Sequence, residues 1–77
     1  MKLREALARN LRRLRAEKRI SQERLALDAG IDRSYVSLLE TEKYSASIDM
    51  VEKLGKVLRV DPVSLLAAPK KPARRSK

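Results

Sequence analysis

The segment from Gln22 to Glu40 constrains the fold most strongly, because it predicts two short helices joined by one tight turn. Ser21 precedes the first helix as an N-cap, and Gly30 ends that helix in the left-handed conformation that glycine adopts at low cost. Asp32 is the next N-cap, and it opens a helix that we expect to run to about Thr41. The chain must therefore set two short helices at a steep angle across a turn at Gly30.

Apolar residues at fixed spacing predict how these two helices pack. Ala26 lies where the helices approach closely, so a small side chain is required there, and Val36 packs back against it. Leu25, Ile31 and Leu39 complete this wedge. We expect the second helix to project outward from the domain.

Helical periodicity predicts three further helices. The first spans about Leu3 to Lys18, and Ser47 caps a fourth helix after a loop at 42–46. Asp61 and Pro62 place an N-cap before a proline at the first helical position, which predicts a short fifth helix. The fourth helix has an apolar stripe of Met50, Val51, Leu54, Val57 and Leu58. No window alternates with period two, so we expect an all-α fold, a compact bundle of five helices.

Composition limits the classes of function. The 77 residues allow one modest domain, and they include no cysteine and no histidine. Without these residues, a disulfide, a thiolate metal site and histidine general-base catalysis are excluded, so we expect no enzyme, cofactor or metal. We find no signal peptide and no membrane-spanning stretch, and therefore expect a cytoplasmic protein. Residues 1–68 are predicted to form the domain, and 69–77 a basic disordered tail.

The net charge of +9 is unevenly distributed. Residues 1–20 hold eight basic side chains against two acidic ones, and residues 69–77 hold five basic side chains and no acid. Without that tail the net charge is still +4. Such a balance favours a polyanionic partner, either nucleic acid or an acidic membrane surface.

The sequence resembles the Xre/Cro/lambda-repressor helix-turn-helix family over roughly residues 4–66. The resemblance is densest at Ser21-Gln22, Leu25-Ala26, Gly30, Val36-Ser37 and Leu39-Glu40. It implies a lambda-repressor-like domain that binds double-stranded DNA as a homodimer, with helices two and three forming the motif. The string from Asp32 to Ser37 is also similar to the recognition helix of restriction–modification controller proteins. Two departures concern the following loop, since the family usually has glycine where Glu42 stands and proline where Ala46 stands.

The resemblance implies that the third helix reads base edges in the major groove. Arg33 lies at its start, where a guanidinium can pair with guanine O6 and N7. Ser34 and Ser37 share its face and suit bases, water or phosphate equally. Leu38 is either a contact to a thymine methyl or a tolerated surface leucine, and Tyr35 is equally a DNA contact or a packing residue.

The resemblance also implies residues that contact the DNA backbone and residues with structural roles. Gln22 is expected to bond a phosphate, with Lys43 and Tyr44 as further backbone contacts. Arg15 and Glu40 match a structural ion pair between helices one and three. The helix face of Arg9, Arg12 and Arg13 is interpreted as solvated and is not assigned to DNA. We expect dimerisation through Val63, Leu65 and Leu66.

The leading hypothesis is a sequence-specific transcription regulator on a palindromic operator, without a small-molecule ligand. A phage-type repressor, a restriction–modification controller, an antitoxin and a general regulator all fit. A membrane-surface protein would use the basic amphipathic first helix, but it leaves the wedge of Ala26, Gly30 and Val36 unexplained. A protein–protein adaptor with the same fold is disfavoured by Arg33 and the net charge.

Overall fold

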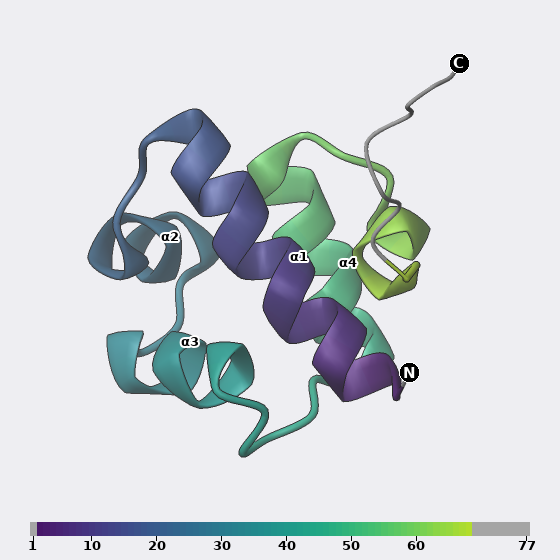
Figure 1. The fold of residues 1–77 in the computed structure, drawn as a ribbon. Helices are drawn as coiled ribbons and strands as arrows, with labels where there is room; N and C mark the ends of the chain where they lie inside the picture. The colour runs from purple at the N-terminus through teal and green to yellow at the C-terminus, as the bar shows by residue number, and fades with distance from the viewer. Residues whose placement is uncertain (1, 69–77) are drawn as a thin grey trace.

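The computed structural model describes residues 2–68, which form four α-helices and one short 3-10 helix. These elements are α1 (Leu3–Lys18), α2 (Gln22–Ala29), α3 (Arg33–Glu40), α4 (Ile48–Leu58) and η1 (Pro62–Leu66). In Figure 1, α1 crosses in front of α4, α2 and α3 lie on one side of this pair, and η1 lies on the other. The described residues contain no strand, so the all-α prediction is confirmed. The tail predicted for 69–77 lies outside the described residues.

Helices α2 and α3 begin where the sequence predicted, because a side chain caps the first turn of each of them. The hydroxyl of Ser21 accepts a hydrogen bond from the backbone N–H of Arg24 at 2.9 Å. The carboxylate of Asp32 accepts one from the N–H of Ser34 at 3.2 Å. Gly30 ends α2 with φ of 67°, in the left-handed region. These caps satisfy amides that a helix leaves unpaired, and they fix the boundaries of α2 and α3.

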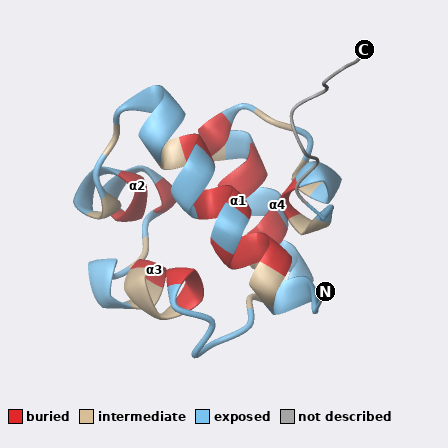
Figure 2. Cartoon of the chain, in the orientation of Figure 1, coloured by how far each residue is buried: buried red, intermediate tan, exposed pale blue. Residues whose placement is uncertain are grey.

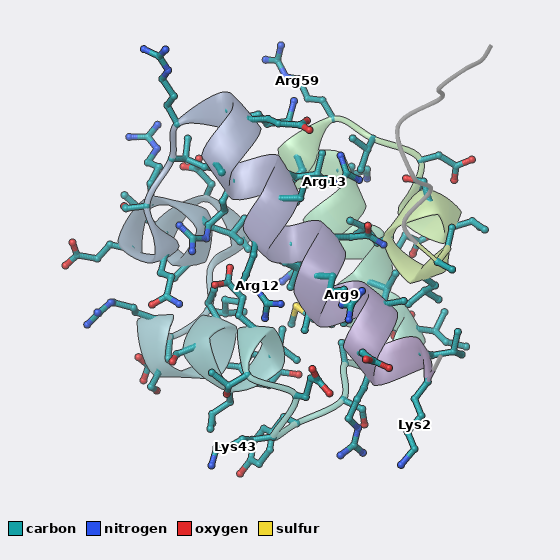
Figure 3. The ribbon with its side chains drawn as sticks, viewed as in Figure 1. Lys2, Arg9, Arg12, Arg13, Lys43 and Arg59 are labelled. Atoms are coloured by element: carbon teal, nitrogen blue, oxygen red, sulfur yellow. The ribbon has the colours of Figure 1, made fainter. Side chains whose placement is uncertain are left out.

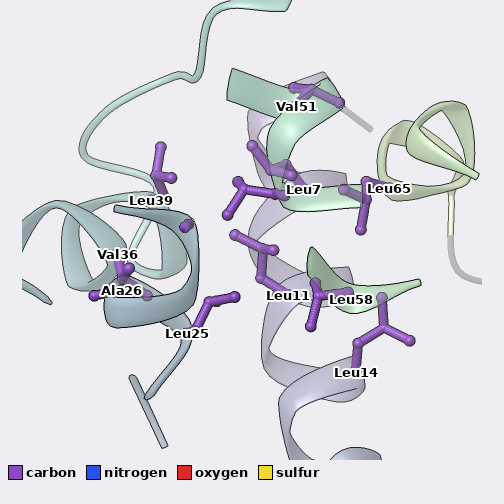
Figure 4. Packing of buried hydrophobic residues seen from close by; sticks show 12 residues of the cluster. Leu7, Leu11, Leu14, Leu25, Ala26, Val36, Leu39, Val51, Leu58 and Leu65 are labelled. Carbon is purple, nitrogen blue, oxygen red and sulfur yellow. The ribbon is translucent and has the colours of Figure 1, made fainter. Parts of the chain in front are cut away.

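The core lies where α1, α4 and the wedge between α2 and α3 meet. Figure 2 shows the buried faces of the helices turned toward this centre. Ala26 and Val36 are 3% and 0% exposed, as expected for the close approach of α2 to α3. The larger buried side chains, several of which Figure 4 shows, include Leu7, Leu11, Leu25, Leu39, Leu54, Leu58 and Leu65. In the described part of the chain, no helix is long and apolar enough to cross a membrane.

The prediction of five α-helices is wrong at its last element. The carboxylate of Asp61 caps the segment by accepting from the N–H of Val63 at 3.0 Å, as predicted, but the segment is a 3-10 helix. Its N–H of Ser64 bonds to the carbonyl of Asp61, three residues earlier. In sequence, Pro69 follows closely, and proline has no N–H with which to continue an α-helical ladder. A short segment in this context forms a single tight turn.

Gly55 allows η1 to lie directly on α4. This glycine is buried within α4, and a Cβ atom placed on it would lie 2.8 Å from the Cα of Pro62. That distance is well inside van der Waals contact, and the opposing atom belongs to the backbone, which yields less easily than a side chain. The missing side chain therefore determines how closely η1 approaches the domain.

Candidate nucleic-acid interface

Two faces of α3 have different roles. Val36, Leu39 and Glu40 are buried against the domain, whereas Arg33 and Ser34 are exposed. Ser37 and Leu38 are half-buried and line the outer face. A surface hollow of about 460 Å³ is lined by Asp32, Arg33, Ser34, Ser37 and Leu38. The structure thus brings four of the predicted reading residues onto one accessible surface.

Arg33 is the basic residue that lines this hollow. In residues 2–68, the ion pairs of Arg9, Arg13 and Arg24 are with carboxylates four residues away on their own helices. No such pair involves Arg33 or Lys43 within the described residues. Both side chains are exposed. Their charges are therefore available to phosphates or bases.

Tyr35 is turned away from the hollow and toward the loop that follows α3. Its ring lies edge-on to the ring of Tyr44, with centroids 6.1 Å apart and an interplanar angle of 65°. This is a favourable aromatic geometry. Tyr35 thus has a packing role in the structure, and it connects α3 to a loop residue predicted to contact the DNA backbone.

The loop keeps a defined shape despite its departures from the family pattern. Glu42 has φ of 65°, the left-handed region in which a side chain costs about 1–2 kcal/mol and glycine costs little. This conformation fits the glycine that the family pattern has at this position. The N–H groups of Lys43 and Tyr44 both bond to the carbonyl of Leu38, at 3.0 and 3.2 Å. Lys43 and Tyr44 are consequently held next to the end of α3, and both are exposed; Figure 3 shows Lys43 there.

The predicted pair of Arg15 and Glu40 is confirmed, and it belongs to a larger network. The Nε and Nη2 atoms of Arg15 donate to the carboxylate of Glu40 at 2.7 and 2.9 Å. Glu40 is only 2% exposed. Burial of Glu40 raises the pKa of its carboxyl, whereas the hydrogen bonds from Arg15 and Gln22 lower it. The lowering effects together outweigh that of burial, so the pKa is below its ordinary value. The carboxylate is held charged between α1, α2 and α3.

Gln22 is part of the same network. Its side-chain Nε2 donates to the carboxylate of Glu40 at 3.0 Å, and the residue is half-buried. The side chain is therefore held in place at the first turn of α2, close to the free amides of that turn. The predicted phosphate contact stays a prediction, and the internal contact with Glu40 was not anticipated.

Arg12 is not merely a solvated side chain, and this corrects the interpretation of its helix face. Its Nη1 donates to the backbone carbonyl of Glu40, so it caps the C-terminus of α3. Figure 3 shows Arg12 reaching from α1 toward α3. The spacing of charges along α1 held no signal for this contact, because the carbonyl lies 28 residues away in sequence.

Sequence reasoning also missed Arg4. This residue near the beginning of α1 is exposed, and its Nη1 donates to the carbonyl of Glu42 at 3.5 Å. A guanidinium is thereby placed beside the loop that carries Lys43. Only the general excess of basic residues in the first twenty positions pointed to a role for it.

The predicted dimerisation residues do not share one environment. Leu65 is 0% exposed and belongs to the core of its own chain, so its prediction as an interface residue is wrong. Val63 is 72% exposed and Leu66 is half-buried. Ile48, which was not predicted, is 85% exposed and lines a groove of about 360 Å³ with Val63 and Leu66. Its position at the first turn of α4, outside the main apolar stripe, was the only sequence signal.

Comparisons with known proteins agree with this geometry. A family model described as helix-turn-helix matches residues 11–65. The chain is 40% identical over 67 residues to a hypothetical transcription factor of Neisseria meningitidis, covering 87% of this chain and 63% of that protein. It therefore spans less than two thirds of that relative. It is 35% identical over 65 residues to control protein C.BamHI of Bacillus amyloliquefaciens, covering 83% and 80% of the two chains.

Solved structures show the same fold. The crystal structure of the hypothetical transcription factor NHTF from Neisseria matches with a TM-score of 0.85 and 40% identity, over 88% of this chain and 78% of that one. The restriction–modification controller protein C.AhdI from Aeromonas hydrophila matches with 0.77 and 37%, over 80% and 94%. The clp gene regulator ClgR from C. glutamicum matches with 0.78 and 29%, over 86% of each chain.

Proposed function

This chain belongs to the HTH_3 family of Xre-type helix-turn-helix, DNA-binding transcription regulators, and we propose that it reads a palindromic operator in the major groove as a homodimer. The observation that carries the proposal is the outer face of α3. Arg33, Ser34, Ser37 and Leu38 line one hollow there, and none of their side chains is needed for a described cap or core contact.

Arg33 is proposed to supply the strongest base contact. A guanidinium can donate to O6 and N7 of one guanine at once, which discriminates against other bases by about 1–3 kcal/mol. Its position in the first turn of α3 is the part of a recognition helix that approaches base edges. Ser34 and Ser37 are small enough to let the helix lie deep in the groove.

Phosphate contacts are proposed on either side of α3. Gln22 stands at the beginning of α2 and is held by Glu40, while Lys43 and Tyr44 stand at the other end of the motif. We add Arg4, because its guanidinium lies against the carbonyl of Glu42 next to Lys43. Such contacts set the register of a protein on DNA without reading sequence.

A homodimer is supported by the exposed apolar groove beside η1. Ile48 and Val63 are branched aliphatic residues with 85% and 72% exposure, and exposed apolar side chains of this size tend to mark contact sites when they cluster. A two-fold contact brings the same patch from both copies together, so an apolar patch is complementary to itself. Two recognition helices about 34 Å apart would then fit successive major grooves.

Among the regulators of this family, a restriction–modification controller is the candidate that a specific observation favours. The segment from Asp32 to Ser37 resembles controller recognition helices, and two of the relatives reported above carry controller names. The chain's own target genes would test this, because a controller operator lies beside genes for a restriction enzyme or its methyltransferase.

Selection from a random duplex library, followed by sequencing, tests the proposal directly. We expect a palindromic consensus with two half-sites about one helical turn apart. Binding to phosphatidylserine vesicles that exceeded duplex binding at the same salt concentration would instead support a membrane-surface protein. Selected sequences that shared no common motif would contradict sequence-specific reading.

A matched pair of variants then separates reading from positioning. Arg33→Ala should lose about 1–3 kcal/mol on the selected site, concentrated at one base pair per half-site, with little change on random duplex. Lys43→Ala should show a smaller, sequence-independent loss and a salt slope reduced by about 0.9. Both variants must retain wild-type helicity and melting temperature. Equal losses on selected and random duplex for Arg33→Ala would make Arg33 a phosphate contact.

A further inference from the structure

Asn10 is a buried polar residue that the DNA-facing surface does not use. It lies in the middle of α1 and is 1% exposed. Its Nδ2 atom donates to the backbone carbonyls of Leu65 at 2.7 Å, Ala67 at 2.9 Å and Ser64 at 3.3 Å. The side chain thus joins α1 to a segment more than fifty residues later in the chain.

The surroundings fix the orientation of this amide. Three carbonyl oxygens surround one end, where only a donor is favourable, and the Nη2 of Arg13 donates to Oδ1 at the other end, at 3.3 Å. Both polar atoms of Asn10 therefore have partners inside the protein. Removing this amide would take a donor away from the carbonyls of Leu65 and Ala67, whereas the carbonyl of Ser64 would keep its bond from the N–H of Ala67.

The end of η1 needs such a donor. The last carbonyls of any helix lack internal partners, and among residues 2–68 the N–H of Ala67 bonds back to Ser64 at 3.3 Å. In the 3-10 pattern the donor to the carbonyl of Leu65 would be the N–H of Ala68, and no such bond is present among the described residues. An α-helical bond would come from Pro69, which has no N–H. Asn10 supplies that missing donor at 2.7 Å.

The position of η1 in turn defines the apolar groove. Val63 and Leu66 come from η1, whereas Ile48 comes from α4, so the patch exists only while η1 is docked. Pro62 seated on Gly55 holds one end of η1, and Asn10 holds the other. We infer that Asn10 is the positioning residue for dimerisation, because it holds η1 where Val63 and Leu66 align with Ile48.

This inference rests on the proposed homodimer. It predicts that loss of the Asn10 amide weakens dimerisation without weakening half-site binding. Asn10 has no hydrogen bond to α2 or α3. Losing its amide should therefore loosen η1 and leave the DNA-reading face intact. A purely structural role would instead lower fold stability, half-site binding and dimerisation together.

The experiment compares Asn10→Ala and Asn10→Ser with the full-length wild type. Sedimentation equilibrium measures the dimer dissociation constant, and fluorescence anisotropy measures affinity for a single half-site duplex. For Asn10→Ala we expect dimerisation to weaken about tenfold or more, with half-site affinity within about twofold. Asn10→Ser keeps one donor and should lie between. Hydrogen exchange should show the amide of Ala67 losing protection while the amides of α2 and α3 keep theirs.

Ala29→Gly serves as the control, since it lowers stability through a buried residue of α2 that lies outside η1. At a similar melting temperature this variant should dimerise like the wild type. If the wild type dimerises and Asn10→Ala has the same dimer dissociation constant, the proposed role of Asn10 is wrong, and the proposed homodimer is not affected. A wild-type chain that stays monomeric at concentrations of roughly tens of micromolar would overturn the proposed homodimer, whatever the variants do.

Discussion

Replacing Arg15 with methionine should destabilise the domain by about 3–5 kcal/mol at neutral pH, because it leaves a buried carboxylate without its countercharge. Methionine keeps an apolar stem of similar length, so the change removes the two charged hydrogen bonds to Glu40, at 2.7 and 2.9 Å, and one to the carbonyl of Ile20 at 3.0 Å. One neutral bond, from Gln22 at 3.0 Å, would be left. Since a domain of this length is stabilised by about 4–12 kcal/mol, the variant should be close to unfolding.

The loss should depend on pH with a definite sign. In the wild type the pKa of Glu40 is below its unfolded value, so this group stabilises the fold above the unfolded pKa of about 4.3. That contribution disappears as the pH falls through the lower, folded pKa. In Arg15→Met, burial would dominate and raise the pKa of Glu40, so protonation would relieve the variant. The difference in stability between the two proteins should therefore be largest near neutral pH and shrink toward pH 4.

Urea denaturation followed by far-ultraviolet circular dichroism, at several pH values between 7 and 4, measures this difference. Arg9→Met is the matched control, because Arg9 lies on the same helix and pairs with Glu5 at 3.6 Å, with side chains 51% and 33% exposed. Such a surface pair should change stability by less than about 1 kcal/mol. An Arg15→Met variant that lost no more stability than Arg9→Met, or a loss that did not vary with pH, would refute the assigned role of the buried carboxylate.

Three further outcomes are expected. Gly55→Ala should destabilise the domain by about 1–3 kcal/mol in thermal melts, because the new methyl group meets the backbone of Pro62; a stabilised variant would contradict the close approach of η1. Glu42→Gly should raise stability by up to about 1 kcal/mol, since glycine relieves a left-handed conformation but also adds freedom to the unfolded chain; a clear loss in the same melts would oppose this. Truncation after residue 68 should lower DNA affinity and flatten its salt dependence while sequence preference is kept; loss of preference in a binding titration would show that the tail does more than attract DNA.

The helices of the motif were predictable because their boundaries are set by neighbouring residues. Ser21 and Asp32 each accept a bond from an amide two or three residues later, and Gly30 adopts the backbone conformation that it alone reaches cheaply. Such interactions are visible in a short window of sequence. The predicted bounds of the first two helices coincide with α1 and α2, and of these two helices α2 is the one begun by a side-chain cap.

The features that sequence did not reveal depend on contacts between distant segments. The docking of residues 62–66 on the domain involves Asn10 and the room left by Gly55, and neither contact has a local signature. The burial of Leu65 follows from the same docking, which is why an apolar residue predicted for an interface lies in the core. Arg12 was misjudged for a similar reason, since its partner is a backbone carbonyl and not a carboxylate.

In α3, the residues that hold the helix in place are largely separate from those on its outer face, and this separation affects how a new binding specificity can evolve. Apart from Asp32, which begins the helix and also lines its outer hollow, the residues that shape α3 differ from those that line the hollow: Val36 and Leu39 anchor the helix, and Glu40 ties it to α1. Mutations at positions 33, 34, 37 and 38 should consequently change the target sequence with little loss of folding. A duplicated gene could pass through many such intermediates as soluble, folded proteins. Divergence of operators among relatives would then require few compensating changes elsewhere in the domain.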